Sequence, residues 1–377
     1  MGDRGLTGAR PPLRGLKVVE LARILAGPWA GQVLADLGAE VVKVESLGGD
    51  DTRGWGPPFV ENADGTKDAA YFHAANRGKS SIVADFRDPA DLARVVDLIR
   101  EADVLIENFK LGGLAQFGLD YAALAAINPR LIYCSITGFG HTGPYAARAG
   151  YDFIVQGMSG IMDLTGAPDG PPMKIGVAYA DILTGLYAVI AVQAALLQRA
   201  ETGRGQHIDL ALFDVMVGTL ANQAMNALVS GVSPTRMGNA HPNIVPYEAF
   251  PVADGWLIIA CGNDTQFARL TALLGLPERA EWRTNAGRVA DRAAVSPAVA
   301  EATLRWNRDA LLAALELEGV PAGPINTVAQ ALADPQIAAR GMVTELGEGL
   351  RGIASPMRFS DADLQRGKRS PSLPGKQ

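Results

Sequence analysis

The first residues with a chemically suggestive spacing follow an apolar run. Residues 131–144 read LIYCSITGFGHTGP and contain Gly138, Gly140 and Gly143 in a G-x-G-x-x-G pattern. This spacing is typical of a dinucleotide-binding loop, and Asp163 follows about where an acid would bind the ribose. However, the loop follows the fifth predicted strand rather than the first, and 43 glycines make a chance match easy. We therefore predict a ligand loop at the end of a parallel strand, but not an NAD site.

An aspartate stands at the start of the longest apolar run. Asp181 precedes ILTGLYAVIAVQAALL, residues 182–197. Alone, this placement is typical of a helix N-cap. The positive end of a helix dipole would also favour the ionised carboxylate, which is the nucleophilic form. The two roles are compatible, so an N-cap and a nucleophile both remain open.

The chain has few cysteines and histidines that could act as reactive thiols or bind a metal ion. Cys134 and Cys261 both lie in apolar runs, which predicts buried thiols and a reducing compartment rather than a disulfide framework. The four histidines have no metal-ligand spacing. We therefore expect no metal site.

Alternating β-rich and helical patterns must position these residues. This alternation predicts an α/β fold with a parallel sheet flanked by helices, and such sheets bind ligands at the carboxyl ends of their strands. The predicted strands cover 16–22, 39–45, 80–86, 102–109, 130–138 and 206–213.

The composition changes after residue 231. A loop rich in proline and asparagine, residues 233–246, precedes a predicted hairpin that turns at 253–255. We predict a large Rossmann-like domain with a parallel sheet and a smaller α+β domain, with a C-terminal segment that returns to the large domain. The predicted boundaries are 1–235, 236–325 and 326–377.

Charge and hydropathy exclude several partners. The net charge of −6 argues against nucleic acid or an acidic membrane as the main partner. The apolar run 182–197 is short for a membrane span and contains polar residues, which favours a buried helix. Residues 1–15 lack the apolar core of a signal peptide and predict a short disordered arm. We expect a soluble, cytoplasmic protein.

Motifs along nearly the whole chain occur in the order of a known family. In chain order they are VVELARILAGPWAGQVLADLGAEVVKVE, GDDTRGWGPPF, YFHAANRGKSSI, IENF, SITGFGHTGP, AGYDF, GVAYADILTGLYA, TGRGQHIDLALFD, NAHPNIVPYEAF, GNDTQFA and GVPAGPINT. Together they resemble the class III CoA-transferases, which include formyl-CoA and carnitine CoA-transferases and the α-methylacyl-CoA racemases. The resemblance implies an interlaced homodimer whose substrates are a CoA thioester and a carboxylic acid, with no tightly bound cofactor. It also implies a final helix beyond SLPGKQ, so we expect the last dimer contact to differ here.

The same resemblance implies that Asp181 is the nucleophile. Its carboxylate would attack an acyl-CoA to form a mixed anhydride, and the released CoA thiolate would return to give an aspartyl-CoA thioester. An acceptor carboxylate would then attack that thioester, and CoA would capture the new acyl group. Water must be excluded, because either intermediate would hydrolyse.

The resemblance further assigns residues to CoA. Relatives often carry an arginine where Gln116 stands, so Lys110 is the alternative cation for the phosphates. The assigned residues are Ile24, Leu25 and Ala26 near the adenine; Arg53, Asn76 and Lys79 for the phosphates; Asn108 and Phe109 beside the pantetheine; and Thr137 and Phe139 in the glycine loop.

A loop in the second half corresponds to the one that covers the active aspartate in relatives. It reads GNAHPN rather than a run of glycines, which departs from the family pattern. His241 would either bind a substrate carboxylate or pack at the domain boundary. The oxyanion and substrate residues predicted here are Gly238, Asn239, Ala240, His241, Arg236 and Asn243.

Two other functions remain as alternatives. A racemase of this family needs a histidine in a GHD motif, but Tyr151 stands there, and its reference pKa of about 10 makes it a poor base. A silent acyl-CoA binder would be expected to have lost Asp181. The motifs are most similar to the dicarboxylate branch, which includes succinate–hydroxymethylglutarate CoA-transferase. We therefore expect succinyl-CoA as donor and a C4–C6 dicarboxylate as acceptor.

Overall fold

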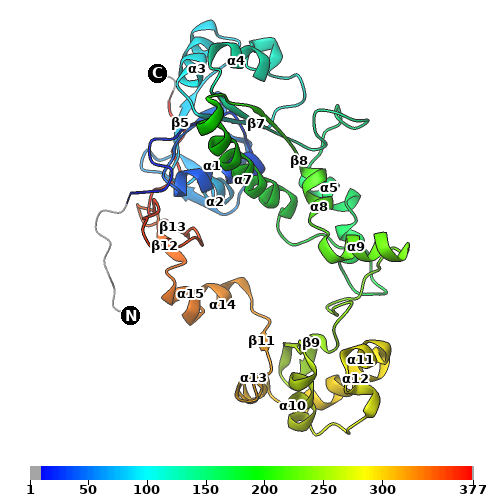
Figure 1. Ribbon diagram of the computed structural model, residues 1–377. Coiled ribbons are helices and arrows are strands. Elements are labelled where there is room, and N and C mark those ends of the chain that lie inside the picture. Colours follow the sequence, from blue (N-terminus) through cyan, green and yellow to red (C-terminus); the bar gives the residue numbers. More distant parts are fainter. Residues whose placement is uncertain (1–9, 376–377) are drawn as a thin grey trace. The chain divides into compact units, whose positions relative to one another are not determined.

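The computed structural model describes residues 10–375 (Figure 1). It divides into a first unit, made of residues up to 161, 174–229 and the residues from 335 onward, and a second unit made of 162–173 and 230–334. Composition gave no sign that 162–173 belong to the second unit. The chain re-enters the first unit at 335, later than the predicted 326. Residues 1–9 of the predicted arm lie outside the described part.

A parallel sheet forms the centre of the first unit. Its order is β5-β2-β1-β6-β7-β8, and every neighbouring pair is parallel. The order reverses between β1 and β6, which creates the switch point where open α/β sheets bind ligands. The strands are β1 (Lys17–Glu20), β2 (Glu40–Glu45), β5 (Ser80–Val83), β6 (Val104–Glu107), β7 (Ile132–Thr137) and β8 (His207–Ala211). The predicted α/β class is confirmed.

Helices cover both faces of this sheet. Alternate strand residues point to opposite faces, so Val18 joins one core and Val19 the other. The first core includes residues of α1 (Ala26–Asp36), α7 (Tyr179–Thr202) and α8 (Leu212–Gly218), and the second includes α3 (Pro89–Arg100) and α4 (Tyr121–Ile127). The other helices of the first unit are α2 (Ala70–Asn76), α5 (Asp152–Met158), α9 (Ala221–Ser230) and α15 (Pro335–Ala339), and α6 (Ile161–Leu164) begins the segment that belongs to the second unit.

The long helix α7 packs along α1 (Figure 1). Gly185 permits this approach, because an added Cβ would lie 2.7 Å from the Ala26 carbonyl oxygen. By length and composition, α7 could also cross a membrane. One side of it, however, supplies Ala188 and Val192 to the core of the sheet.

The second unit has its own core around an antiparallel sheet ordered β11-β10-β9. The predicted hairpin is present, with its turn at Ala253 and Asp254. Its elements are β9 (Tyr247–Val252), β10 (Gly255–Ala260), α10 (Asp264–Leu274), α11 (Asn285–Ala290), α12 (Arg292–Thr303), α13 (Arg308–Leu317), β11 (Ala322–Pro324) and α14 (Val328–Leu332). Two small hairpins, β3 (Phe59–Glu61) with β4 (Lys67–Ala69) and β12 (Val343–Glu345) with β13 (Arg351–Ile353), belong to the first unit.

Candidate active site

A groove of about 410 Å³ in the first unit contains Asp181. Its walls are the segments that follow β1, β6 and β7, which are the strand ends beside the switch point. Several predicted residues meet here: Ile24, Leu25, Ala26, Asn108, Phe109, Thr137 and Asp181 all line this groove. The segment predicted to lie near the adenine therefore lies in the same groove as Asp181.

The turn that follows β1 is held in a strained conformation. Ile24 has φ +71°, a left-handed value that is rare for a β-branched residue and costs roughly 1–3 kcal/mol. Asp50 Oδ2 accepts a hydrogen bond from the Ile24 amide at 3.1 Å. Asn108 accepts from the Arg23 amide at 2.9 Å and donates to the Arg23 carbonyl at 2.7 Å. These bonds fix the backbone that leads to the uncapped amino end of α1.

Asp181 lies in the first turn of α7, but it does not cap the helix. The N-cap position is Ala178, so the N-cap interpretation is wrong. Burial, and after it the neighbouring Asp152 carboxylate, raise the pKa of Asp181 to about 7. A helix dipole typically contributes about 0.3–1 kcal/mol, which desolvation exceeds here. Burial therefore opposes the expected preference of Asp181 for the ionised form.

The glycine loop is built for close backbone contact. A Cβ added at Gly138 would lie 2.4 Å from the Gly150 Cα, so the two ends of the loop touch. Gly140 has φ +82°, and its amide donates to Thr137 Oγ1 at 2.8 Å. Phe139 is almost fully buried, does not line this groove, and packs on Tyr145 at 5.6 Å between ring centroids, so its predicted contact with CoA stays a prediction.

Three cations line the groove of Asp181: Arg23, Lys110 and Arg148. Arg23 pairs with Asp51 at 2.9 Å. The Arg148 guanidinium lies over the Tyr145 ring, 4.5 Å from its centroid, and in the described part of the chain it forms no ion pair. Sequence reasoning missed Arg148, although it stands between the glycine loop and GYD, two segments assigned to the site.

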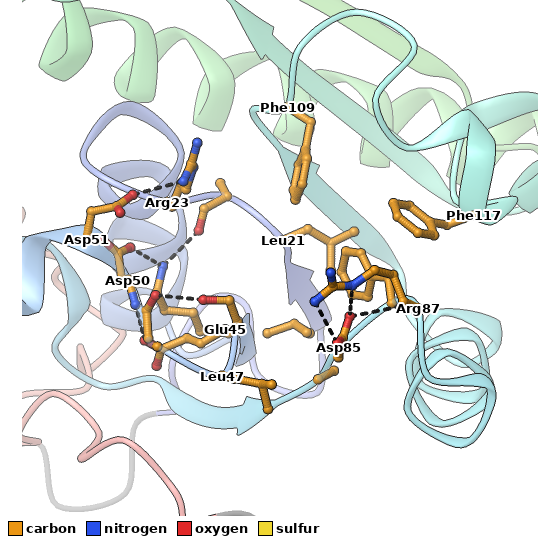
Figure 2. Close-up of a pocket in the computed structure, with 18 residues that line it drawn as sticks. Leu21, Arg23, Glu45, Leu47, Asp50, Asp51, Asp85, Arg87, Phe109 and Phe117 are labelled. Atoms are coloured by element: carbon orange, nitrogen blue, oxygen red, sulfur yellow. Dashed lines mark hydrogen bonds and ion pairs between the residues drawn. The ribbon is translucent and has the colours of Figure 1, made fainter.

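A second groove of about 520 Å³ lies at the ends of β1, β2 and β5 (Figure 2). Phe109 and Phe117 lie on one side of it, and Leu47 and the Asp85–Arg87 pair lie on the other. Phe109 and Phe117 also line the groove of Asp181, so the two grooves adjoin. Arg87 bonds Asp85 at 2.9 Å but stays 80% exposed, which leaves its charge accessible.

Lys79 and Asn76 lie in the protein interior. The Lys79 ammonium contacts Glu20 Oε2 at 2.8 Å and Asn76 Oδ1 at 2.8 Å, and both charged side chains are fully buried. Neither Lys79 nor Asn76 lines either groove. The Lys79 ammonium neutralises the buried Glu20 carboxylate instead, and a contact of Lys79 or Asn76 with the CoA phosphates stays a prediction.

Arg53 has a similar structural role. Its guanidinium pairs with Glu45 at 2.7 Å and Asp68 at 2.8 Å, with 7% of the side chain exposed. A cation that two buried carboxylates already neutralise has little left to offer a phosphate. A contact of Arg53 with a phosphate therefore also stays a prediction, which these two ion pairs disfavour.

The predicted substrate loop, Arg236 to Asn243, belongs to the second unit. Arg236 pairs with Asp163 at 2.6 Å. Asp163 is the acid that stands at the ribose-binding position of the glycine pattern, and this ion pair already engages its carboxylate. His241 packs on Tyr247 at 5.2 Å between centroids, and its Nδ1 accepts from the Asn243 amide at 3.1 Å. These contacts hold the loop within its own unit. A role of Gly238, Asn239 and Ala240 toward Asp181 stays a prediction.

The groove lacks the acid–base pair of a racemase. Among the described residues, no histidine lines it, and Tyr151 lines it at the position of the expected histidine. A carboxylate in a groove at the switch point, with cations around it, suits nucleophilic acyl chemistry better than proton transfer at carbon.

Comparison with known proteins agrees with this chemistry. The family model described as CoA-transferase family III matches residues 13–377. The chain belongs to this family. The predicted family and enzyme class are thereby confirmed, and this CoA-transferase moves CoA between an acyl-CoA and a carboxylic acid.

Individual relatives match the CoA-transferase over almost its full length. The succinate–glutarate CoA-transferase of Agrobacterium fabrum is 57% identical over 97% of this chain and 93% of its own. The human succinyl-CoA:glutarate CoA-transferase is 40% identical over 99% of this chain and 87% of its own. A crystal structure of a CaiB/BaiF family protein from Brucella suis is 65% identical, with a TM-score of 0.89 over 97% of both chains.

Proposed function

We propose that this CoA-transferase carries CoA from succinyl-CoA to a C4–C6 dicarboxylate, with glutarate as the first candidate. The observation that carries the proposal is Asp181, a carboxylate in a groove at the switch point of the sheet. The named activities of the Agrobacterium fabrum and human relatives support the choice of acids.

The proposed reaction has four steps on Asp181. A carboxylate oxygen attacks the succinyl-CoA carbonyl, and the C–S bond breaks to give a mixed anhydride and CoA thiolate. The thiolate attacks the Asp181 carbonyl carbon, which releases succinate and leaves an aspartyl-CoA thioester. The acceptor carboxylate attacks this thioester and again expels the thiolate. The thiolate then attacks the acceptor's acyl carbonyl, which gives the new CoA ester and restores Asp181.

The groove suits each of these steps. Every tetrahedral intermediate needs N–H donors for its oxyanion, and the Leu25 and Ala26 backbone lines the groove at the uncapped end of α1. The pinned turn at Ile24 holds that backbone ready, so little reorganisation is needed during the reaction. The pKa of Asp181 near 7 makes its carboxylate a stronger nucleophile than an ordinary aspartate.

We assign the two adjoining grooves to different parts of CoA. The pantetheine arm would lie between Asn108 and Thr137 and bring the thioester to Asp181. The nucleotide would lie in the second groove, where Arg87 supplies charge and Phe109 an aromatic face. The ligand loop after β7 would thus serve a nucleotide-containing ligand, CoA.

Arg148 is the proposed partner of the distal carboxylate. It lines the groove of Asp181, and its guanidinium is held on Tyr145 rather than in an ion pair. No described cation acts on Asp181 itself, so Arg148 does not neutralise the nucleophile. An acyl group on Asp181 would carry its free carboxylate toward this guanidinium.

The proposal includes a homodimer. Large apolar side chains on three helices of the first unit are strongly exposed, which is costly for a monomer. They are Phe153 and Ile154 on α5, Ile190 and Leu197 on α7, and Leu228 and Val229 on α9. A second copy of the chain would cover them, and it would also account for the apolar exposed side of α7.

The test is to incubate the protein with succinyl-CoA, trap it with hydroxylamine, and map the modified peptide by mass. Modification at Asp181, absent in Asp181→Asn and without CoA ester, is the expected result. No modification with several acyl-CoA donors would overturn the proposal. Exchange of the α-proton of a 2-methylacyl-CoA would then support the racemase, and CoA binding without any exchange would support a silent binder.

A further inference from the structure

Asp152 connects the amino ends of α5 and α7. Its Oδ1 accepts a hydrogen bond from the Ala180 amide at 2.9 Å, immediately before Asp181. Its Oδ2 accepts from Gln156 Nε2, also at 2.9 Å. Gln156 is fully buried, and its Oε1 accepts from the Ile175 amide at 2.9 Å. One carboxylate and one amide therefore hold the segment that leads into the nucleophile.

The charge of Asp152 is not needed for its bond to the Ala180 amide, although the bond from Gln156 Nε2 does need the second carboxylate oxygen as acceptor. An asparagine would also offer Oδ1 to the Ala180 amide, yet the chain places a second carboxylate beside Asp181. The cations of the groove, Arg23, Lys110 and Arg148, form no ion pair with Asp152 among the described residues. The helix α2 presents Tyr71, whose pKa is raised by burial and by Asp181, Asp152 and Asp50. The first turn of α1 is AGPWA and carries no charge, and Asp214 on α8 is exposed to solvent.

We propose that Asp152 is a positioning residue of the transferase reaction, which fixes the first turn of α7 and destabilises the free carboxylate of Asp181 relative to its acylated forms. The inference rests on the proposed function, because it requires Asp181 to be acylated.

The charge balance of the reaction explains the advantage. The Asp181 carboxylate that attacks is negatively charged. In the anhydride its attacking oxygen is bonded to the acyl carbon, and in the thioester a sulfur atom has replaced that oxygen, so neither form carries the charge. The charge leaves on the CoA thiolate or on succinate. Asp152 therefore repels Asp181 before the attack but not afterwards. Because this repulsion is relieved as the reaction proceeds, it lowers the barrier of the acylation step. The raised pKa of Asp181 has the same origin, together with burial.

The inference is tested with Asp152→Asn, Gln156→Ala and the surface control Asp97→Asn. The pH profile of kcat/KM should have an acid limb with an apparent pKa near 7 in the wild type. In Asp152→Asn we expect this apparent pKa to shift to lower pH by about half a pH unit or more. The fraction of enzyme trapped as adduct should fall about tenfold. Gln156→Ala keeps the charge, so it should lower kcat without moving the limb. Asp97→Asn should change neither.

An infrared titration separates this inference from the proposed function. The protonated carboxyl band lost in Asp181→Asn reports the ionisation of Asp181 without any substrate, and it should titrate at lower pH in Asp152→Asn. A thermal melt confirms that each variant is folded. An unmoved infrared titration, or an acid limb that stays in place while kcat falls, would overturn the electrostatic role. Absence of any adduct in the wild type, with the infrared shift intact, would instead count against the proposed function.

Discussion

Asp181 is held by the fold at a cost in stability. Burial raises its pKa from an ordinary 3.8 to about 7. Between these two values, the folded protein keeps a proton that the unfolded chain has lost, so stability decreases as the pH rises through this window. Above pH 7 the penalty is complete, and for a partly enclosed group it amounts to about 2–4 kcal/mol. Below pH 4 both states are protonated and the penalty vanishes.

This predicts that Asp181→Asn stabilises the protein while it abolishes transfer. The free energy of unfolding in urea should rise by about 2–4 kcal/mol at about pH 8 and change little at about pH 4. Asp163→Asn, at an exposed carboxylate, is the matched control for the loss of a charge. An equal gain at both pH values would show that the burial of the charge is not its cause.

Arg148 gives a prediction about specificity. Arg148→Met should lower kcat/KM for succinyl-CoA by about tenfold or more, because a charge-assisted hydrogen bond is worth about 1.5–3 kcal/mol. The value for acetyl-CoA, which has no distal carboxylate, should stay nearly unchanged. Steady-state kinetics with both donors checks this. An equal loss for both would mean that Arg148 binds CoA itself.

At the scale of elements, Lys79 is expected to stabilise the sheet, whereas Arg87 is expected to bind CoA. Lys79, just before β5, and Lys43 on β2 both pair with the buried Glu20 at the end of β1, so Lys79→Met leaves that carboxylate with one cation and should destabilise the protein by about 3 kcal/mol. Arg87→Met should instead raise KM for every CoA ester and leave the unfolding midpoint unchanged. Urea titration and donor kinetics on both variants check this. A stable Lys79→Met with a raised KM would support its predicted contact with phosphate.

The elements of the sheet were predictable, but their polar interior was not. The strand patterns locate β1, β2, β5, β6, β7 and β8 within a few residues. The structure adds the cap of α3, where the Asp88 carboxylate accepts from the Ala90 and Asp91 amides ahead of Pro89. Lys79 and Arg53 were assigned to phosphates from the family resemblance and from their positive charge. Their partners, Glu20 and Glu45, come from other strands, and no local pattern reports a pairing of that kind. Asp152 was missed for the same reason, since its bond to Ala180 joins distant segments.

At the scale of the whole molecule, the exposed apolar side chains make a prediction about assembly. Leu228 and Val229 on α9 are 79% and 81% exposed. Leu228→Asp should weaken the proposed dimer and give a monomer at micromolar protein concentration, as measured by sedimentation velocity. Leu317→Asp, on an equally exposed leucine of the second unit, is the control and should leave the mass unchanged. A wild type that sediments as a monomer would contradict the proposed homodimer.

The contact between Gly138 and Gly150 also matters for redesign of the acid that this enzyme accepts. Because the two backbones touch, neither position tolerates a side chain, and libraries that randomise them would mostly yield misfolded protein. Residues 146–149 lie between the same two anchors and line the groove of Asp181, yet the contact does not constrain their side chains. Directed evolution toward longer, shorter or uncharged acids should therefore vary residues 146–149, while Gly138 and Gly150 fix the two ends of this segment.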